Sequence, residues 1–174
     1  GLRGSLDDAL TATGWAQVRK AMRGAGPWDR IISSPLQRCA RFAEELADAR
    51  AVPLALEPDL QELHFGAWEG RSAAELMETD AEALGLFWAD PYAFTPPEGE
   101  PLVQFQARIH QALQRLYRAY AGERLLVWSG TVREAFMNTR FDLVMELDLA
   151  GVHVGAGSEP QLGLSSYFDI EVMP

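Results

Sequence analysis

The chain has 174 residues, of which 48% are hydrophobic and 23% charged, a balance typical of a globular domain and not of a disordered chain. The formal net charge of −10 disfavours nucleic acid and anionic lipid as partners, but a local arginine pocket can still bind a small phosphorylated metabolite. The chain has neither an apolar run of the roughly 20 residues that span a bilayer nor an apolar signal core, so we expect a cytoplasmic protein whose residues 1–174 form a single domain.

Helix and strand patterns alternate in the first third of the chain. Ser34 and Pro35 predict the N-cap and the first position of a helix. Cys39 lies among the apolar positions of that helix, which favours a small buried hydrophobe over a metal ligand. The apolar spacing predicts helices over residues 11–24 and about 35–50, and strands over residues 28–33 and 52–56.

The remainder of the chain continues this alternation less regularly. Residues 141–164 carry no pattern that predicts an element, and residues 165–172 alternate polar and apolar side chains, as a half-buried edge strand does. We also predict a loop at 58–70, short helices at 72–79 and 80–89, a proline-rich irregular segment at 90–101, a long helix at about 102–121, a strand at 125–128 and a helix at about 131–140.

The alternating patterns predict an α/β fold, a three-layer α/β/α sandwich with a mostly parallel sheet and helices on both faces. Ligands of such folds bind outside the carboxyl ends of the strands. Residues 33–38 and 128–131 are the turns that follow two predicted strands. We therefore expect the chemistry of the protein at these two turns.

Arg38 is the first candidate functional residue. It lies on the first turn of a predicted helix, whose N-terminal N–H groups and positive dipole end attract anions. Its planar guanidinium can bind a phosphate through two hydrogen bonds. The alternative is a surface arginine that pairs with a nearby acid.

Glu62 is the second candidate. The segment 60–70 combines two glycines, aromatic residues and two glutamates, which indicates a loop packed over something. A carboxylic acid in a partly apolar loop can have a raised pKa and donate a proton to a leaving group. The alternative is that Glu62 or Glu69 accepts hydrogen bonds from the loop backbone, and for Glu69 we favour this alternative.

Four segments in a defined order carry a family pattern. They are Leu6–Gln17, Ser33-Ser34-Pro35-Leu36-Gln37-Arg38, Glu62-Leu63-His64-Phe65-Gly66-Ala67-Trp68-Glu69-Gly70, and Pro97-Glu98-Gly99-Glu100 with the trailing Arg108. In order and spacing, over about residues 3–137, they resemble the histidine phosphatase superfamily, which has the phosphoglycerate-mutase-like fold. Within that family the pattern is most similar to the α-ribazole phosphatases of cobalamin synthesis.

The resemblance implies a covalent mechanism without a metal or other cofactor. A histidine in an Arg-His-Gly motif after the first strand attacks phosphorus, and water then hydrolyses the phosphohistidine. A glutamate that matches Glu62 protonates the leaving oxygen, and arginines, one matching Arg38, bind the phosphoryl oxygens. Gly4 and His64 fall in the segments that would line the substrate.

The chain departs from the family at both catalytic histidines. It begins after the first strand, so Arg-His-Gly is absent, and Ser129 stands where the second histidine is expected, leaving Ser129 as a candidate phosphate ligand. A sheet without that central strand would expose apolar edges on both sides of a gap. We therefore expect either that the native polypeptide is longer or that another segment fills the gap.

None of the remaining histidines is a strong substitute for the nucleophile. His64, His110 and His153 are each more typical of structural or solvated residues, and Ser129 lacks the Gly-x-Ser-x-Gly elbow of a serine nucleophile. The leading hypothesis is a phosphatase acting on a small phosphate monoester. Its first candidate substrate is α-ribazole 5′-phosphate, followed by a sugar phosphate or phosphoglycerate.

Two other hypotheses stay open. The first is a catalytically inactive relative that binds a phosphorylated ligand or a protein partner, and the second is an α/β scaffold in which every motif is structural. Expected partners are a small phosphorylated metabolite and, as a further alternative, a second copy of the chain in a homodimer.

Overall fold

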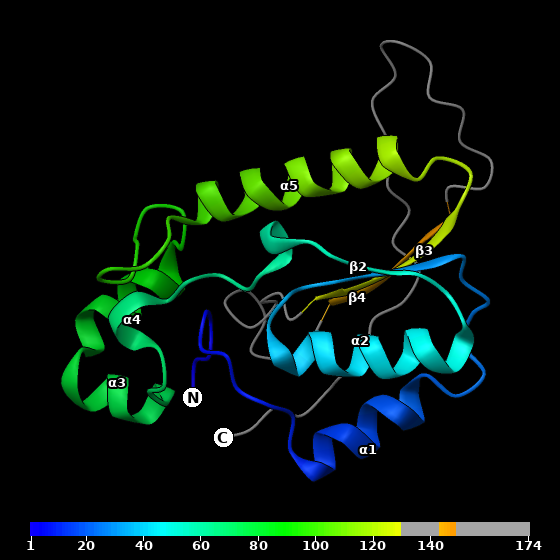
Figure 1. Ribbon diagram of the computed structural model, residues 1–174. Coiled ribbons are helices and arrows are strands. Elements are labelled where there is room, and N and C mark those ends of the chain that lie inside the picture. Colours follow the sequence, from blue (N-terminus) through cyan, green and yellow to red (C-terminus); the bar gives the residue numbers. More distant parts are fainter. Residues whose placement is uncertain (130–142, 149–174) are drawn as a thin grey trace.

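The computed structural model of the chain describes residues 1–129 and the backbone of residues 143–148 (Figure 1). The helix predicted at about 131–140 and the strand predicted at 165–172 lie outside these residues. The helices are α1 (Ala12–Ala21), α2 (Gln37–Arg50), α3 (Ala73–Thr79), α4 (Ala81–Ala89) and α5 (Leu102–Ala119); the strands are β1 (Arg30–Ser33), β2 (Leu54–Leu56), β3 (Arg124–Ser129) and β4 (Leu143–Asp148); two short 3-10 helices are η1 (Pro58–Leu60) and η2 (Gly66–Trp68).

Every element predicted within residues 1–129 is present, with differences of a few residues at its ends. The largest difference is at α1, which ends at Ala21 instead of residue 24. Gly24 and Gly26 follow with φ values of +74° and +97°, which no regular helix allows. The helix therefore ends before these glycines, although the apolar pattern in the sequence predicts a longer one.

The described strands form one continuous sheet in the order β2-β1-β3-β4. β1 runs parallel to both β2 and β3, with Ser33 paired to Leu56 on one side and to Trp128 on the other. β4 pairs with β3 in the antiparallel direction, from Arg124–Asp148 to Ser129–Leu143. The predicted parallel sheet is thus confirmed for β1, β2 and β3, and β4 comes from the stretch for which no element was predicted.

Helices cover both faces of this sheet, which confirms the three-layer α/β/α arrangement (Figure 1). β1 and β3 alternate their side chains between two cores, because successive residues of a strand point to opposite faces. The core under α1 and α2 contains Val18, Met22, Ile31, Cys39, Phe42, Leu46, Leu126 and Trp128. The core under α5 contains Ile32, Ala112, Leu113, Leu116, Tyr117, Leu125 and Val127.

A third apolar cluster lies beyond the sheet, where α3 and α4 pack near the start of α5 (Figure 1). Trp68 is fully buried there, and its indole N–H donates to Asp80 at 2.9 Å. The ring of Trp68 stacks on Phe94 and meets Phe87 edge-on. The cluster therefore anchors the loop 60–70 from its far end.

The N-terminus of α2 differs from the prediction. The helix begins at Gln37, with Leu36 as its N-cap, and not at Pro35 after Ser34. Asp7 takes the capping role from a distant segment, because its Oδ1 accepts the Gln37 N–H at 2.6 Å and its carbonyl oxygen accepts the Gln37 side-chain amide. A carboxylate at this positive helix end is stabilising, so part of the anion-attracting helix terminus is already occupied by the protein itself.

The described strands leave no gap in the sheet, because β3 has a strand on each side. β4 lies against the edge of β3 that faces away from β1. Within residues 1–129 and 143–148, no helix is both long and apolar enough to cross a membrane.

Candidate functional site

Buried polar side chains gather at one end of the sheet. Within residues 1–129 they are Ser33, Ser34, Arg38 and Ser129, and each is at most 3% exposed. Ser33 and Ser129 are the last residues of β1 and β3, and the Ser34 N–H donates to the Trp128 carbonyl at 2.9 Å, which holds the two strand ends together. Burial of polar groups costs free energy unless they are hydrogen-bonded, so this end of the sheet is built for polar contacts.

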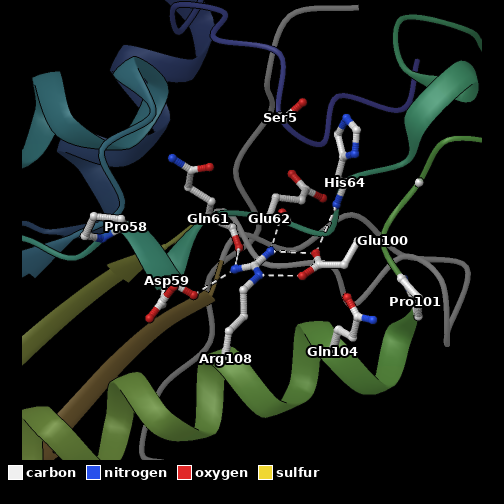
Figure 2. A pocket seen from close by; sticks show the side chains of 11 residues that line it. Ser5, Pro58, Asp59, Gln61, Glu62, His64, Glu100, Pro101, Gln104 and Arg108 are labelled. Atoms are coloured by element: carbon white, nitrogen blue, oxygen red, sulfur yellow. Dashed lines mark hydrogen bonds and ion pairs between the residues drawn. The ribbon is translucent and has the colours of Figure 1, made fainter.

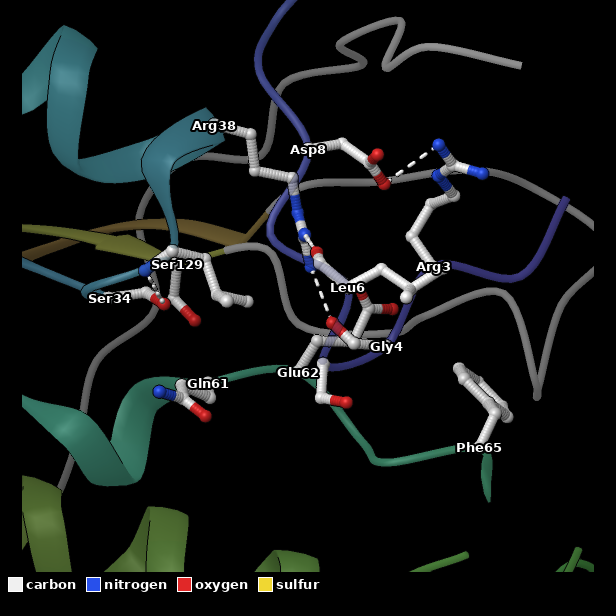
Figure 3. A network of polar contacts seen from close by, with 12 residues as sticks. Arg3, Gly4, Leu6, Asp8, Ser34, Arg38, Gln61, Glu62, Phe65 and Ser129 are labelled. Carbon is white, nitrogen blue, oxygen red and sulfur yellow. Dashed lines mark hydrogen bonds and ion pairs between the residues drawn. The ribbon is translucent and has the colours of Figure 1, made fainter. Parts of the chain in front are cut away.

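Arg38 extends from the first turn of α2 toward the N-terminal segment and the loop that carries Glu62 (Figure 3). Its Nη1 donates to the Leu6 carbonyl at 2.7 Å, and its Nη2 donates to the Gly4 carbonyl at 2.8 Å and to Glu62 Oε2 at 2.9 Å. The side chain is 2% exposed. Arg38 is therefore a buried cation held in one orientation, and the acid it pairs with is the other candidate residue.

The loop that carries Glu62 is held by its main-chain oxygens. The Ser129 hydroxyl donates to the Leu60 carbonyl at 2.5 Å. Arg108 Nη1 donates to the carbonyls of Asp59 and Gln61, both at 2.7 Å, and Arg108 Nη2 donates to the Glu62 carbonyl at 2.9 Å. Four consecutive carbonyls thus have side-chain donors, which fixes the backbone from which the Glu62 carboxyl projects.

Arg108 is itself oriented by Glu100. Its Nε and Nη2 donate to the two Glu100 carboxylate oxygens at 2.7 and 2.9 Å, a two-point arrangement that sets the plane of the guanidinium. The Glu100 N–H donates to the His64 carbonyl at 2.8 Å. The segment around residue 100 and the start of α5 therefore hold the loop 59–64 in place.

Gly4 has a backbone conformation that the site requires. Its φ is +47°, and a Cβ at this position would lie 2.1 Å from Glu69 Oε1 and 2.7 Å from the Leu63 carbonyl oxygen. Glu69 accepts hydrogen bonds from Ser5 N at 2.7 Å, Ser5 Oγ at 2.8 Å and Phe65 N at 3.1 Å. The structural interpretation of Glu69 is confirmed, and Gly4 is held where its carbonyl oxygen accepts from Arg38.

A pocket of about 490 Å³ opens beside Glu62 (Figure 2). His64 lines it with a side chain that is 45% exposed, and its Nε2 lies 3.8 Å from Glu69 Oε1. The other described histidine, His110, is exposed on α5, where its ring contacts the Gln114 amide at 2.9 Å. Within the described part of the chain, no group of three or more His, Cys, Asp or Glu side chains is arranged to hold a metal ion.

This order of segments around a buried arginine and a glutamate agrees with a comparison of sequences. Residues 1–148 match the sequence model of the histidine phosphatase superfamily, branch 1. The chain belongs to this superfamily. The match spans the whole of the described site, so the predicted family is confirmed.

Curated relatives of the chain include a bifunctional protein and an adenosylcobalamin/alpha-ribazole phosphatase. A bifunctional protein of Mycobacterium tuberculosis is 36% identical over 129 residues, covering 72% of this chain and 35% of that protein. The adenosylcobalamin/alpha-ribazole phosphatase of Salmonella typhimurium is 30% identical over 116 residues, covering 67% of this chain and 57% of that protein. The chain therefore spans about a third of the first relative's length and somewhat more than half of the second's.

Solved structures resemble the fold over most of the chain. The α-ribazole phosphatase of Shigella flexneri superposes with a TM-score of 0.69 and 26% identity, covering 85% of this chain and 82% of that one. Bacillus stearothermophilus YhfR superposes with a TM-score of 0.71 and 23% identity, covering 98% and 89%, which shows the shared fold. The α-ribazole phosphatases thus recur among both the relatives and the structural neighbours.

Measured against the family pattern, the structure brings the predicted residues together. Arg38 and Glu62 are in contact, Gly4 accepts from Arg38, and Ser129 holds the residue two positions before Glu62. His64 lies apart, on the pocket wall. Their roles toward a substrate stay predictions.

Most of the contacts that support this site are not predictable from the sequence. Arg108 and Glu100 match the family pattern, and this match is the sequence signal for their importance. The ion pair between Arg3 and Asp8, with 2.7 Å between Nη2 and Oδ2, had no signal in the sequence because it depends on how the N-terminal segment folds back (Figure 3).

Proposed function

We propose that this chain carries the phosphoryl-binding arginine and the proton-donating acid of a phosphatase for small phosphate monoesters, with α-ribazole 5′-phosphate as the first candidate substrate. The observation that carries the proposal is the buried Arg38–Glu62 ion pair, 2.9 Å long, at the carboxyl end of β1 and beside an open pocket. The family, and the α-ribazole phosphatases among the relatives, support the reaction and the substrate class.

Arg38 would bind the phosphoryl group. The Leu6 and Gly4 carbonyl oxygens fix the orientation of the Arg38 guanidinium, so this cation is already oriented before phosphate binds. The incoming dianion competes with the Glu62 carboxylate for the same cation, and repulsion between the two anions favours the protonated carboxyl. Phosphate binding and loading of the acid with a proton are thereby linked.

Glu62 would then act on the leaving group. A nucleophile donates an electron pair to phosphorus, the bond from phosphorus to the ester oxygen breaks, and that oxygen takes the proton of the Glu62 carboxyl. Protonation spares the leaving alcohol from departing as an alkoxide. The carbonyl contacts from Ser129 and Arg108 hold the loop so that this carboxyl stays near the phosphoryl group.

The nucleophile of this step is not assigned to a residue of the described chain. The ring of His64 lies near Glu69, and the ring of His110 lies near Gln114. The Ser129 hydroxyl donates its hydrogen bond to the Leu60 carbonyl. This use of Ser129, at the position of the family's second histidine, favours a second candidate function, which is binding of a phosphate monoester without hydrolysis.

Phosphate release from α-ribazole 5′-phosphate and from p-nitrophenyl phosphate tests the proposal, with binding of inorganic phosphate measured in parallel by calorimetry. If the phosphatase function holds, we expect Glu62→Gln to lower kcat about 100-fold or more and to raise the affinity for phosphate, because the carboxylate that competes for Arg38 is removed. Arg38→Lys should lower both turnover and phosphate affinity at least tenfold, because an ammonium cannot replace the two-point guanidinium contact.

Matched controls come from the same elements. Arg41 is exposed on α2 and Glu78 is exposed on α3, so Arg41→Lys and Glu78→Gln should leave turnover and binding unchanged. Phosphate binding that depends on Arg38 but occurs without turnover would support the second candidate function. Absence of both phosphate binding and turnover in the folded wild-type protein would contradict both functions.

A further inference from the structure

We infer that the pocket beside Glu62 selects phosphate esters whose leaving group carries no negative charge, such as a neutral polyhydroxylated riboside, and rejects carboxylated or doubly phosphorylated esters. This inference rests on the proposed function, because it assumes that the phosphoryl group lies at Arg38. It goes beyond that function by dividing the substrate candidates, since α-ribazole and simple sugars are uncharged whereas phosphoglycerate carries a carboxylate.

The charged side chains on the pocket wall are mostly acids. Asp59, Glu62 and Glu100 line the pocket, and Arg108 is the one cation of Lys or Arg type among its lining residues within the described chain (Figure 2). A second anion on the leaving group would enter a space bordered by the carboxylates of Asp59 and Glu100 and by the Glu62 carboxyl. Like charges at such short range repel, most strongly where water is partly excluded.

The arginines that contact the acids of the pocket wall, Arg108 on the wall and Arg115 behind Asp59, are already hydrogen-bonded to those acids. Arg108 donates to both Glu100 oxygens and to three main-chain carbonyls. Arg115 donates to Glu57 at 2.9 Å and to Asp59 at 2.6 Å.

To bind a leaving-group carboxylate, Arg108 would have to give up hydrogen bonds that hold the Glu62 loop. Such a ligand would therefore weaken the support of the general acid, whereas an uncharged ligand leaves it intact. Two effects thus weaken the binding of a carboxylated ligand. The acids of the wall repel it, and the loop that positions Glu62 loses hydrogen bonds from Arg108.

Neutral polar groups complete the wall. Gln61 and Gln104 present amides to the pocket, and each amide can both donate and accept hydrogen bonds (Figure 2). Hydroxyl groups of a sugar or riboside need both kinds of partner and bring no charge. The wall thus has the chemistry of a polyol site and lacks an uncommitted cation among the described residues.

Calorimetric titration of the wild-type chain tests the inference with inorganic phosphate, ribose 5-phosphate, α-ribazole 5′-phosphate and 3-phosphoglycerate as ligands. We expect the two esters with an uncharged leaving group, ribose 5-phosphate and α-ribazole 5′-phosphate, to bind at least as tightly as inorganic phosphate. We expect 3-phosphoglycerate to bind at least tenfold more weakly than ribose 5-phosphate. The measurement does not depend on turnover, so it applies equally if the chain binds without hydrolysis.

One added charge should change this preference. Gln104→Lys places a cation on the pocket wall, and we expect it to raise the affinity for 3-phosphoglycerate relative to ribose 5-phosphate at least fivefold. Gln111 is exposed on the same helix and does not line the pocket, so Gln111→Lys, with the same change in net charge, should leave the ratio unchanged.

The outcomes separate the inference from the function on which it rests. If inorganic phosphate binds through Arg38 but 3-phosphoglycerate binds as tightly as ribose 5-phosphate, the inference is wrong and the proposed function stands. An equal shift of the ratio by both lysine variants would also overturn it, because the effect would then come from net charge alone. If no phosphate compound binds, the proposed function fails and the inference fails with it.

Discussion

Gly66 shows how a single residue joins two distant motif segments. Its φ is +58°, and a Cβ there would lie 2.1 Å from the Pro97 carbonyl oxygen and 2.4 Å from Gly99 N. The Ala67 N–H donates to that same Pro97 carbonyl at 2.8 Å. The loop 60–70 and the segment 97–100, which supplies Glu100 to Arg108, can therefore meet only if residue 66 has no side chain.

Gly66→Ala should destabilise the fold by about 2 kcal/mol or more, from the positive φ and from the backbone clash together. Gly85 is the matched control, because it lies inside α4 and a Cβ there meets nothing within 4 Å. Gly85→Ala should stabilise by roughly 0.5–1 kcal/mol. Urea denaturation followed by circular dichroism measures both, and equal effects of the two variants would contradict the packing described for Gly66.

At the scale of elements, the stability of the short helix α3 depends on the hydrogen bonds at its N-terminus. The helix has only seven residues, and the Ser72–Glu75 capping box supplies its first hydrogen bonds. The Ser72 N–H and hydroxyl both donate to Glu75 Oε2, at 2.7 and 2.8 Å. These two hydrogen bonds hold the pKa of the Glu75 carboxyl below its ordinary value of 4.5, and the bond from the Ser72 backbone N–H has the larger effect.

A lowered pKa in the folded state predicts how stability changes with pH. The stabilisation by ionised Glu75 is fully present above pH 4.5 and is lost as the pH falls through the lower folded-state value. Glu45, whose pKa is lowered by its hydrogen bond with Arg19, contributes in the same direction.

We therefore expect the unfolding midpoint in urea to fall with pH below 4.5, and Glu75→Gln to reduce that fall. Glu78→Gln on the same helix is the control. If the acid dependence of Glu75→Gln were as steep as that of the wild type, Glu75 would not be linked to folding.

At the scale of the whole molecule, β3 is the centre of the described structure. It pairs with β1 on one side and β4 on the other, and its residues Leu125, Leu126 and Val127 are at most 1% exposed between two helical layers. β2, in contrast, pairs on one side only among the described strands, and Leu56 at its end is 49% exposed. The strand order thus places the greatest local stability beside the candidate site.

Amide hydrogen exchange should reflect this order. We expect the amides of Leu126 and Val127 to exchange slowest, near the rate set by global unfolding, and those of β2 to exchange at least tenfold faster. Exchange of the β3 amides as fast as that of β2 would mean that β4 does not protect β3 in solution. NMR or mass spectrometry of the intact chain provides the measurement.

The sequence by itself determined the features that depend on neighbouring residues and on motif spacing. Apolar periodicity located the helices and strands of residues 1–129, because the period of a helix or strand is a local property. The motif segments predicted the family, and they also marked Arg38 and Glu62 as the candidate site. The compartment, the partners and the extent of the domain remain predictions.

Only the tertiary structure decided which distant groups meet. The capping of α2 by Asp7, the hold of Arg108 on the carbonyls of residues 59–62, and the place of β4 beside β3 all join segments far apart in the chain. No local pattern specifies such contacts, since many acids, arginines and edge strands could satisfy the same hydrogen-bonding groups. The packing of the two helical layers on the sheet selects among them, and it thereby joins Arg38 to Glu62.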